Sequence, residues 1–173
     1  MTIRLMLSLS AAALLAACAQ LSPYAGQEAL GIKSLSATEI KGYLDGQGMG
    51  FAKPAELNGY PGPMHVLELA DDLKLSELQR AQTAELLHMH KAEARELGRQ
   101  YVDAEAALER IFASREAESS ALHAALAHSA DLQRRIRSSH LSTHLKQTAL
   151  LAPEQIREYS RLRGYAHSHN HTH

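Results

Sequence analysis

Residues 76–114 read SELQRAQTAELLHMHKAEARELGRQYVDAEAALERIFAS, and this stretch decides the fold. Ser76 is a favourable N-cap, and Gln79 three residues later completes a capping box. No proline follows until Pro153. Core-type residues recur at three- and four-residue steps, which predicts an amphipathic helix of up to ~37 residues and ~55 Å. These residues are Leu87, His90, Ala94, Leu97, Tyr101, Ala104, Leu108 and Ile111.

The same spacing restarts after a polar break. Residues 114–120, SREAESS, separate the first series from a second one at Leu122, Leu126, Leu132, Ile136, His140 and Thr143. A turn in this break would fold the second helix back along the first as an antiparallel hairpin. One unbroken helix of roughly 75 residues is the alternative.

Shorter helices are expected on both sides of the long pair. Residues 36–39 form a capping box that opens a helix to about Asp45. The Gly- and Pro-rich residues 46–63 are a loop or hinge, with a helical turn around residues 52–57. Prolines at 63 and 153 mark two further helix starts, and the last helix stops near Gly164. With no Trp and only two Phe, the chain is predicted to be all-α: a long antiparallel helical hairpin with short flanking helices.

The N-terminus is typical of a secreted protein. Residues 1–18 read MTIRLMLSLSAAALLAAC, with Arg4 before an apolar run and small residues before Cys18. The run is too short for a permanent membrane span, which predicts a signal peptide at residues 1–17. Residues 15–18 resemble the bacterial lipobox, and this implies that Cys18 is acylated. Ala19 follows, which resembles lipoproteins of the outer rather than the inner membrane. An ordinary signal peptide or membrane anchor with an incidental cysteine is the alternative.

Charge and cysteine content narrow the class of protein. Cys18 is the only cysteine, so no intramolecular disulfide can form. The formal net charge of −1 becomes about −2 without Arg4, which argues against a nucleic-acid partner. The mature ~155 residues suit one domain. The predicted organisation is a lipidated tether, short helix and loop over 18–62, a helical domain over 63–165 and a His-rich tail over 166–173.

No pattern of an enzyme is present. The sequence has no Gly-x-Ser-x-Gly, no phosphate-binding Gly-rich loop and no His-Glu-x-x-His. The glycines at 46, 48 and 50 precede no nucleotide-binding fold. We therefore expect a non-enzymatic protein without catalytic residues.

Histidines are the main functional signal. The chain has eleven, and His140 and His144 lie four residues apart, which places two imidazoles on one helix face. If Ile111 and Leu122 meet near the turn, paired residue numbers sum to about 233. His140 is then level with Glu93, and His144 with Met89 and His90, to within one turn. The candidate ligands facing the pair are Glu85, His88, His90 and Glu93, with His65 on the preceding short helix.

Such nitrogen and oxygen ligands predict a transition metal ion: zinc, nickel, cobalt or copper rather than calcium or magnesium. Alternatively, His90 and His140 are polar residues of the helix seam that set register and bind nothing. A single hairpin could also leave the site incomplete, with a second chain supplying the rest. The tail is a separate, weaker metal binder or an acid-responsive patch. Its histidines are His167, His169, His171 and His173.

Two short motifs resemble a known family. Residues 75–79, LSELQ, and 151–155, LAPEQ, resemble the paired Leu-Thr-x-x-Gln motifs of the Spy/CpxP family of periplasmic proteins, although Ser76 and Ala152 replace the threonines. The resemblance covers about residues 63–165. It implies helical hairpins that pair into a dimer, some acting as ATP-independent chaperones and others as heavy-metal sensors or zinc resistance-associated proteins. In the sensor branch, ligands lie at places similar to those of His65, Glu85 or His88, and His140 with His144.

Two functions follow as hypotheses. The first is a periplasmic envelope lipoprotein that binds transition metal ions for sensing, buffering or resistance, with a membrane-bound regulator as a candidate partner. The alternative is a chaperone or envelope-stress adaptor that holds unfolded proteins on a mixed basic and apolar surface. For the charges alone, a solvated helix face with i,i+4 ion pairs is the better explanation. The basic residues are Arg95, Arg99, Arg134, Arg135, Arg137 and Lys146.

Overall fold

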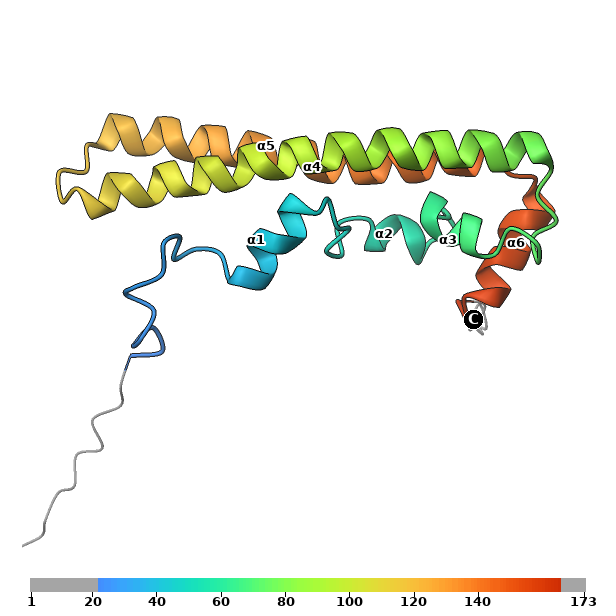
Figure 1. Cartoon of the computed structure of the whole chain (residues 1–173), viewed down its shortest axis with the longest axis horizontal. Helices are drawn as coiled ribbons and strands as arrows, with labels where there is room; N and C mark the ends of the chain where they lie inside the picture. Colours follow the sequence, from blue (N-terminus) through green and yellow to red (C-terminus); the bar gives the residue numbers. More distant parts are fainter. Residues whose placement is uncertain (1–21, 166–173) are drawn as a thin grey trace, which may run out of the picture. The chain divides into compact units, whose positions relative to one another are not determined.

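The computed structural model describes residues 22–165, and these contain helices and no strand, so the predicted all-α class is confirmed. The chain divides into two compact units between Leu30 and Gly31. Residues 22–30 form turns of their own, closed by bonds such as that from Ala25 N to Ser22 O. All helices of the described residues belong to the second unit (Figure 1): α1 Ala37–Leu44, α2 Lys53–Glu56, α3 Pro63–Glu68, α4 Glu77–Ala113, α5 Ser119–Ala149 and α6 Pro153–Leu162.

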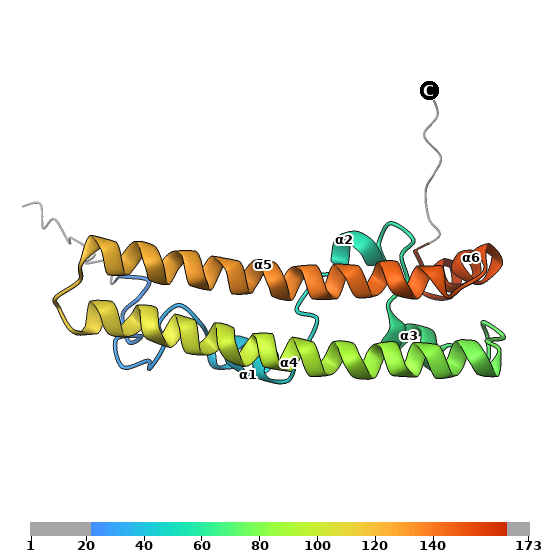
Figure 2. The same ribbon diagram turned by 90° about the horizontal axis from the view of Figure 1, so that it is seen from above.

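The two long helices pack against each other and run in opposite directions (Figure 2). Helix α4 begins with the predicted capping box: the Ser76 hydroxyl accepts from Gln79 N at 3.1 Å, and Gln79 Oε1 accepts from Ser76 N at 3.0 Å. It ends at Ala113, and Arg115 then adopts a positive φ of 61°. The helical path breaks there and resumes at Ser119. The alternative of one unbroken helix is therefore wrong.

The two glutamines of the resembling motifs bind each other across the open end of the long pair. Gln79 Nε2 donates to Gln155 Oε1 at 2.8 Å and to the Leu150 carbonyl at 2.9 Å. Gln155 Nε2 donates to the Leu73 carbonyl at 3.1 Å, and its Oε1 accepts from Ala152 N at 2.9 Å. Each amide thus caps its own helix start and satisfies a carbonyl at the end of another segment. We call this pair the glutamine clasp.

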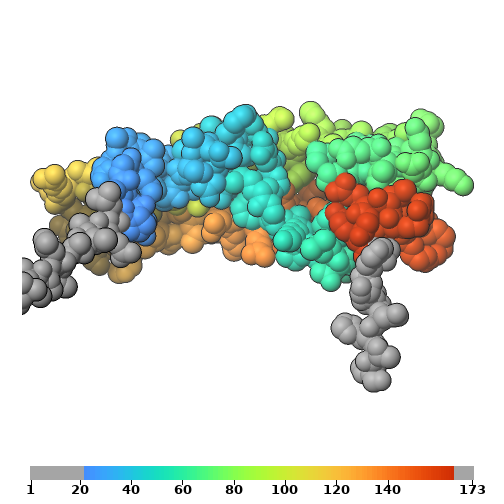
Figure 3. Space-filling model, turned by 90° about the horizontal axis from the view of Figure 1, so that it is seen from below, coloured from blue at the N-terminus to red at the C-terminus, as the bar shows by residue number. Residues whose placement is uncertain are grey.

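The shorter helices lie along one side of the long pair (Figures 1 and 3). The backbone at the end of α1 reaches α4 at Gly98, where an added Cβ would stand 2.0 Å from the Tyr43 carbonyl oxygen. Gly46, with a φ of 64°, then turns the chain away. Residues 31–62, grouped with the tether in the sequence analysis, therefore pack with the helical domain.

Two separate apolar clusters stabilise the unit. Cluster 1 joins α1 to the middle of the long pair, and cluster 2 joins α3 and α6 to the loops beside them. Cluster 1 contains Leu35, Tyr43, Leu97, Tyr101, Ala104, Leu132 and Ile136. Cluster 2 contains Val66, Ala70, Leu73, Leu75, Leu151 and Tyr159.

Between the clusters the contact of α4 with α5 is mainly polar. Gln147 is fully buried and donates to the Thr83 hydroxyl at 3.2 Å. We call this section the polar seam; its members are Thr83, His90, Ser139, His140, Thr143 and Gln147. The predicted histidine site therefore lies in the polar seam between the two apolar clusters.

Across residues 22–165, none of the helices combines the length and the apolar character needed to cross a bilayer. The predicted signal peptide at residues 1–17 and the predicted lipidation at Cys18 lie outside the described residues. Both stay predictions.

Candidate functional site

A chain of hydrogen bonds crosses the polar seam. The Ser139 hydroxyl donates to Glu93 Oε2 at 2.7 Å and lies 3.3 Å from His90 Nδ1. The other nitrogen of that ring, Nε2, lies 3.0 Å from His140 Nδ1. The two imidazoles meet edge to face, with an interplanar angle of 79°. Four side chains from α4 and α5 are thus connected in one line.

The donors and acceptors in this line fix the position of every proton. Glu93, as a carboxylate, only accepts, so the single Ser139 proton points toward it. His90 Nδ1 must then be the protonated nitrogen that donates to the Ser139 oxygen. A neutral His90 has its lone pair on Nε2, so His140 Nδ1 carries the proton between the rings. His140 Nε2 is left unprotonated, and it is buried without a hydrogen-bond partner among the described residues.

The surroundings favour the neutral rings that this assignment requires. Burial lowers the pKa of His140 to about 4, with a smaller effect from the neighbouring His90 and His144. Burial also lowers the pKa of His90, although the Glu93 charge opposes that shift. His140 is 4% exposed, and Phe51 stacks on its ring with centroids 5.7 Å apart. At neutral pH, His140 Nε2 therefore presents a lone pair rather than a proton.

His144 also has its Nδ1 engaged in a hydrogen bond, but with a different partner. Its Nδ1 donates to the Tyr60 carbonyl at 2.7 Å, so the neutral ring has its lone pair on Nε2. This nitrogen faces Gly62, where an added Cβ would lie 3.1 Å from Nε2 and 3.5 Å from Glu56 Oε2. A backbone carbonyl behind the ring is the usual support of a metal-binding histidine.

Glu56 of α2 is a component that the sequence analysis missed. Its Oε2 lies 3.6 Å from His144 Nδ1 and is buried without a hydrogen bond from the described residues. Its Oε1 accepts from the Tyr159 and Tyr165 hydroxyls, the latter at 3.1 Å. The Glu56 charge adds to burial in raising the pKa of Tyr159, which stays a donor at any physiological pH. A glutamate inside a Gly- and Pro-rich segment gives no sequence signal for such burial.

The structure separates the seven predicted ligands of the helical domain. His90, His140 and Glu93 share the hydrogen-bond chain, and His144 lies one turn further along α5. His65 pairs instead with Glu68, 2.7 Å away on α3. Glu85 and His88 are exposed on α4. Within residues 22–165 no three His, Cys, Asp or Glu side chains come close enough to hold an ion together.

The predicted register is close to the observed one. The predicted register places His140 level with Glu93. In the structure His140 contacts His90, which lies less than one turn from Glu93 along α4. Glu93 meets the adjacent Ser139. The tail histidines His167, His169, His171 and His173 lie outside the described residues, so their metal binding stays a prediction.

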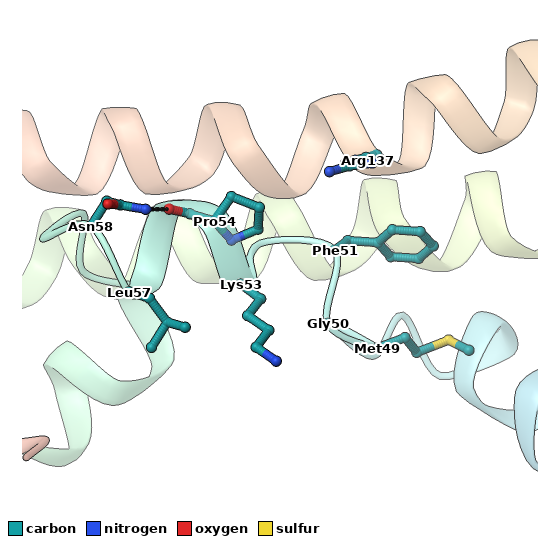
Figure 4. A pocket seen from close by; sticks show the side chains of 8 residues that line it. All are labelled: Met49, Gly50, Phe51, Lys53, Pro54, Leu57, Asn58 and Arg137. Carbon is teal, nitrogen blue, oxygen red and sulfur yellow. Dashed lines mark hydrogen bonds between the residues drawn. The ribbon is translucent and has the colours of Figure 1, made fainter. Parts of the chain in front are cut away.

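Two shallow pockets flank these groups. One, of about 400 Å³, lies between the loop at Phe51, helix α2 and Arg137 of α5 (Figure 4). The Phe51 ring that lines it also stacks on His140. The other, of about 500 Å³, lies between α4 and α5. Its lining residues are Ala81, Gln82, Glu85, Leu86, Lys146 and Leu150.

Comparisons of the chain with models of protein families, with curated proteins and with solved structures gave no match.

Proposed function

We propose that this protein is a periplasmic envelope lipoprotein that binds a transition metal ion through His140 and His144. One observation carries the proposal: both histidines of this i,i+4 pair have Nδ1 engaged as a donor, to His90 and to the Tyr60 carbonyl. Each ring therefore offers Nε2 as an unprotonated nitrogen. Two such nitrogens one helical turn apart are a bidentate metal clamp.

The hydrogen bonds behind the rings support this role. Metal-bound histidines generally donate their second ring N–H to a carbonyl, carboxylate or other acceptor, which fixes the tautomer before the ion arrives. The low pKa of His140, caused mainly by burial, means that no proton competes for Nε2 near neutral pH. Two nitrogens with a nearby carboxylate favour zinc, nickel, cobalt or copper over calcium or magnesium. Sensing, buffering and resistance are the roles that fit such binding.

The test is a zinc titration of the chain lacking residues 1–18 and 166–173, read by competition with a chromophoric chelator. We expect about one ion per chain. His140→Ala together with His144→Ala should abolish the binding. His123→Ala together with His128→Ala is the matched control, because both are exposed histidines of α5. Unchanged affinity in the first double variant would refute the proposal.

A chaperone or stress-adaptor function is the second candidate. It is favoured by exposed apolar side chains on α4 and α5: Leu78 is 66% exposed, Met89 59% and Leu145 57%. Such a surface fits either flexible unfolded clients or a second copy of this chain. Leu78→Glu with Leu145→Glu should remove the protection of an unfolding substrate at stoichiometric amounts. No slowing of aggregation by the unaltered protein would contradict this function.

Location and assembly complete the proposal. Acylation at Cys18 would anchor the protein in the periplasm, at the outer membrane, and a homodimer would pair two copies of the long helices. Cys18→Ser should release the protein from the membrane fraction while leaving zinc affinity unchanged. Retention of that variant in the membrane would contradict the lipid anchor.

A further inference from the structure

We propose that Glu93 is a positioning residue of the candidate metal site: through Ser139 and His90 it holds His140 in the tautomer whose Nε2 is free to bind an ion. The inference rests on the proposed function and deepens it, because it names what keeps that nitrogen unprotonated. It also gives Glu93, expected from the sequence as a ligand, a different role. Glu93 controls the binding of an ion without touching it.

The four side chains alternate between the two long helices, which pack side by side (Figure 2). Glu93 and His90 lie about one turn apart on α4, and Ser139 directly precedes His140 on α5. The Ser139 hydroxyl lies 2.7 Å from Glu93 Oε2 and 3.3 Å from His90 Nδ1. His90 Nε2 then lies 3.0 Å from His140 Nδ1. Every hydrogen bond of this line therefore crosses from one helix to the other.

Only two arrangements of protons satisfy such a line when both rings are neutral. The Ser139 hydroxyl and the His90 ring each donate one proton and accept one, so all protons point toward Glu93 or all point away from it. In the first arrangement His140 carries its proton on Nδ1, and in the second on Nε2. The direction of the line therefore decides which nitrogen of His140 is free.

Only the Glu93 end selects between the two arrangements. At the other end, His140 Nε2 is buried without a hydrogen-bond partner among residues 22–165, so no neighbour there favours a proton or a lone pair. The Glu93 carboxylate, in contrast, can only accept. The reversed arrangement would leave its oxygen 2.7 Å from the Ser139 oxygen with no proton between them. Ser139 is buried, so water has little access to relieve that contact.

The charge of Glu93 also favours an ion at the far end of the line. A hydrogen bond to a charged acceptor is about twice as strong as one between neutral groups, and successive bonds polarise one another. A cation at His140 Nε2 would draw electrons from the ring and strengthen the bond that Nδ1 donates to His90. Partners behind a metal-binding histidine typically contribute about 10- to 100-fold in metal affinity.

The first experiment reads the tautomer without any metal. It uses nitrogen NMR of the chain of residues 19–173 with labelled histidines, because protonated and unprotonated ring nitrogens resonate in separate regions. The His140 signals are those that disappear in His140→Gln. We expect the proton on Nδ1 in the unaltered chain. Glu93→Gln should populate the Nε2–H form as well, because an amide both donates and accepts. Ser139→Ala, which interrupts the line, should do the same.

Two matched control variants leave the line intact. Glu85→Gln removes the same charge from an exposed position of α4. Ser138→Ala removes an exposed hydroxyl directly beside Ser139. Both variants should keep the proton of His140 on Nδ1.

The second experiment is a zinc titration of the same proteins, followed at the His140 signals so that other histidines do not contribute. An ion that binds one tautomer is weakened by the fraction of that tautomer, so one competent ring in ten means about tenfold weaker binding. Zinc affinity at His140 should fall in Glu93→Gln and in Ser139→Ala by at least the factor that the tautomer populations give. It should stay unchanged in the two controls.

The outcomes separate this inference from the proposed function. A proton on Nε2 of His140 in the unaltered chain, or an unchanged tautomer in both Glu93→Gln and Ser139→Ala, would overturn the inference. Equal weakening by Glu85→Gln would also overturn it, because lost charge alone would then explain the effect. If the tautomer changes as expected but zinc leaves the His140 signals of the unaltered chain unmoved, the positioning by Glu93 is supported and the proposed function is refuted.

Discussion

The functional role of His140 depends on which of its two ring nitrogens carries the proton. The ring is 4% exposed, and its Nδ1 proton is fixed by the line that runs through His90 and Ser139 to Glu93. Protonating Nε2 would place a charge where no acceptor is available among residues 22–165. The folded state therefore resists the second proton that an exposed histidine takes up readily.

Stability should consequently fall as the medium becomes acidic. Burial holds the pKa of His140 at about 4 in the folded state, against 6.5 ordinarily. The unfolded chain binds the proton first, so stability is complete above pH 6.5 and is lost as the pH falls toward 4. The expected slope is on the order of 1 kcal/mol per pH unit, less where water reaches the ring. Urea unfolding between pH 7.5 and 4.5 measures it.

The control for this pH dependence is a second histidine of α5. His140→Gln should flatten the slope of the unfolding free energy between pH 6.5 and 5. His128→Gln should leave it as it is, because His128 is exposed. Equal slopes in the unaltered protein and in His140→Gln would contradict the assignment of a buried neutral ring.

Gly62 is needed for the space that it leaves. A Cβ at this position would stand 2.9 Å from Cε1 of His144 and 3.1 Å from its Nε2. Gly62→Ala should displace the ring, cost roughly 1–3 kcal/mol in the free energy of unfolding and weaken zinc binding at least tenfold. Gly48→Ala is the control, since nothing lies within 4 Å of a Cβ there. Full zinc affinity in Gly62→Ala would show that His144 needs no fixed orientation.

Sequence reasoning identified part of the candidate site. Helical periodicity placed His90, Glu93 and His140 on the facing sides of two helices, because these residues follow regular spacing. It could not place Glu56, whose position depends on how residues 46–63 cross α5. Helical periodicity also predicted that Glu85, His88 and His65 lie near His140 and His144. The position of each residue around its own helix axis directs its side chain elsewhere.

At the scale of elements, the glutamine clasp explains why two helix starts far apart in sequence share a motif. Gln79 and Gln155 exchange hydrogen bonds and also serve backbone groups near both helix starts. Truncating one should leave part-buried hydrogen-bonding groups of the other and of the backbone without a partner. Each single change to Ala should cost about 1–3 kcal/mol.

A double-mutant cycle separates the pair from its backbone contacts. The two changes together should cost less than their sum by at least about 0.5 kcal/mol, because the second removes a partner already lost. Denaturant unfolding of the four proteins gives the coupling free energy. Gln82→Ala combined with Gln155→Ala should be additive, since Gln82 is exposed. Additivity for Gln79 as well would show that the two amides stabilise their helices independently.

The crossing of α1 over α4 gives another prediction. An alanine in a helix interior normally stabilises by about 1 kcal/mol relative to glycine. At Gly98, however, its Cβ would stand 2.0 Å from the Tyr43 carbonyl oxygen. Gly98→Ala should therefore destabilise, by roughly 1–3 kcal/mol, and urea unfolding measures the sign. A more stable variant would mean that α1 is not seated on α4.

Helix positions could be predicted because local signals agree with packing. Ser76, Gln79 and the spacing of Leu97, Tyr101 and Ala104 predict α4 before any contact is known. The path of the loop between α1 and α3 could not be predicted. It depends on contacts such as those of Phe51 with His140 and of Tyr60 with His144, and neither leaves a periodic pattern in the sequence.

The buried apolar side chains of the second unit are concentrated in two separate clusters. Clusters 1 and 2 lie on either side of the polar seam. Hydrogen bonds contribute less net free energy there than buried apolar surface would, so we expect the seam to open locally before the clusters do. Hydrogen exchange should be faster in residues 137–149 than in residues 125–136.

Zinc should change this profile. An ion that binds only the folded seam stabilises it by about 1.4 kcal/mol for each tenfold excess over its dissociation constant. Protection of residues 137–149 should therefore rise more than that of residues 125–136, as measured by hydrogen exchange with mass spectrometry. The variant His140→Ala with His144→Ala should show no such rise. An unchanged profile on adding zinc would contradict binding at the seam.

The bond from Tyr165 to Glu56 joins positions 109 residues apart. A chain with a single cysteine has no covalent means of closing so large a loop on itself. In polymer terms, a permanent cross-link over ~100 residues removes about 4–5 kcal/mol of conformational freedom from the unfolded chain. The hydrogen bond at Glu56 closes the same loop reversibly, because it breaks and re-forms without the reductant that a disulfide needs. The topology of the folded chain is therefore held by an equilibrium rather than by a covalent link.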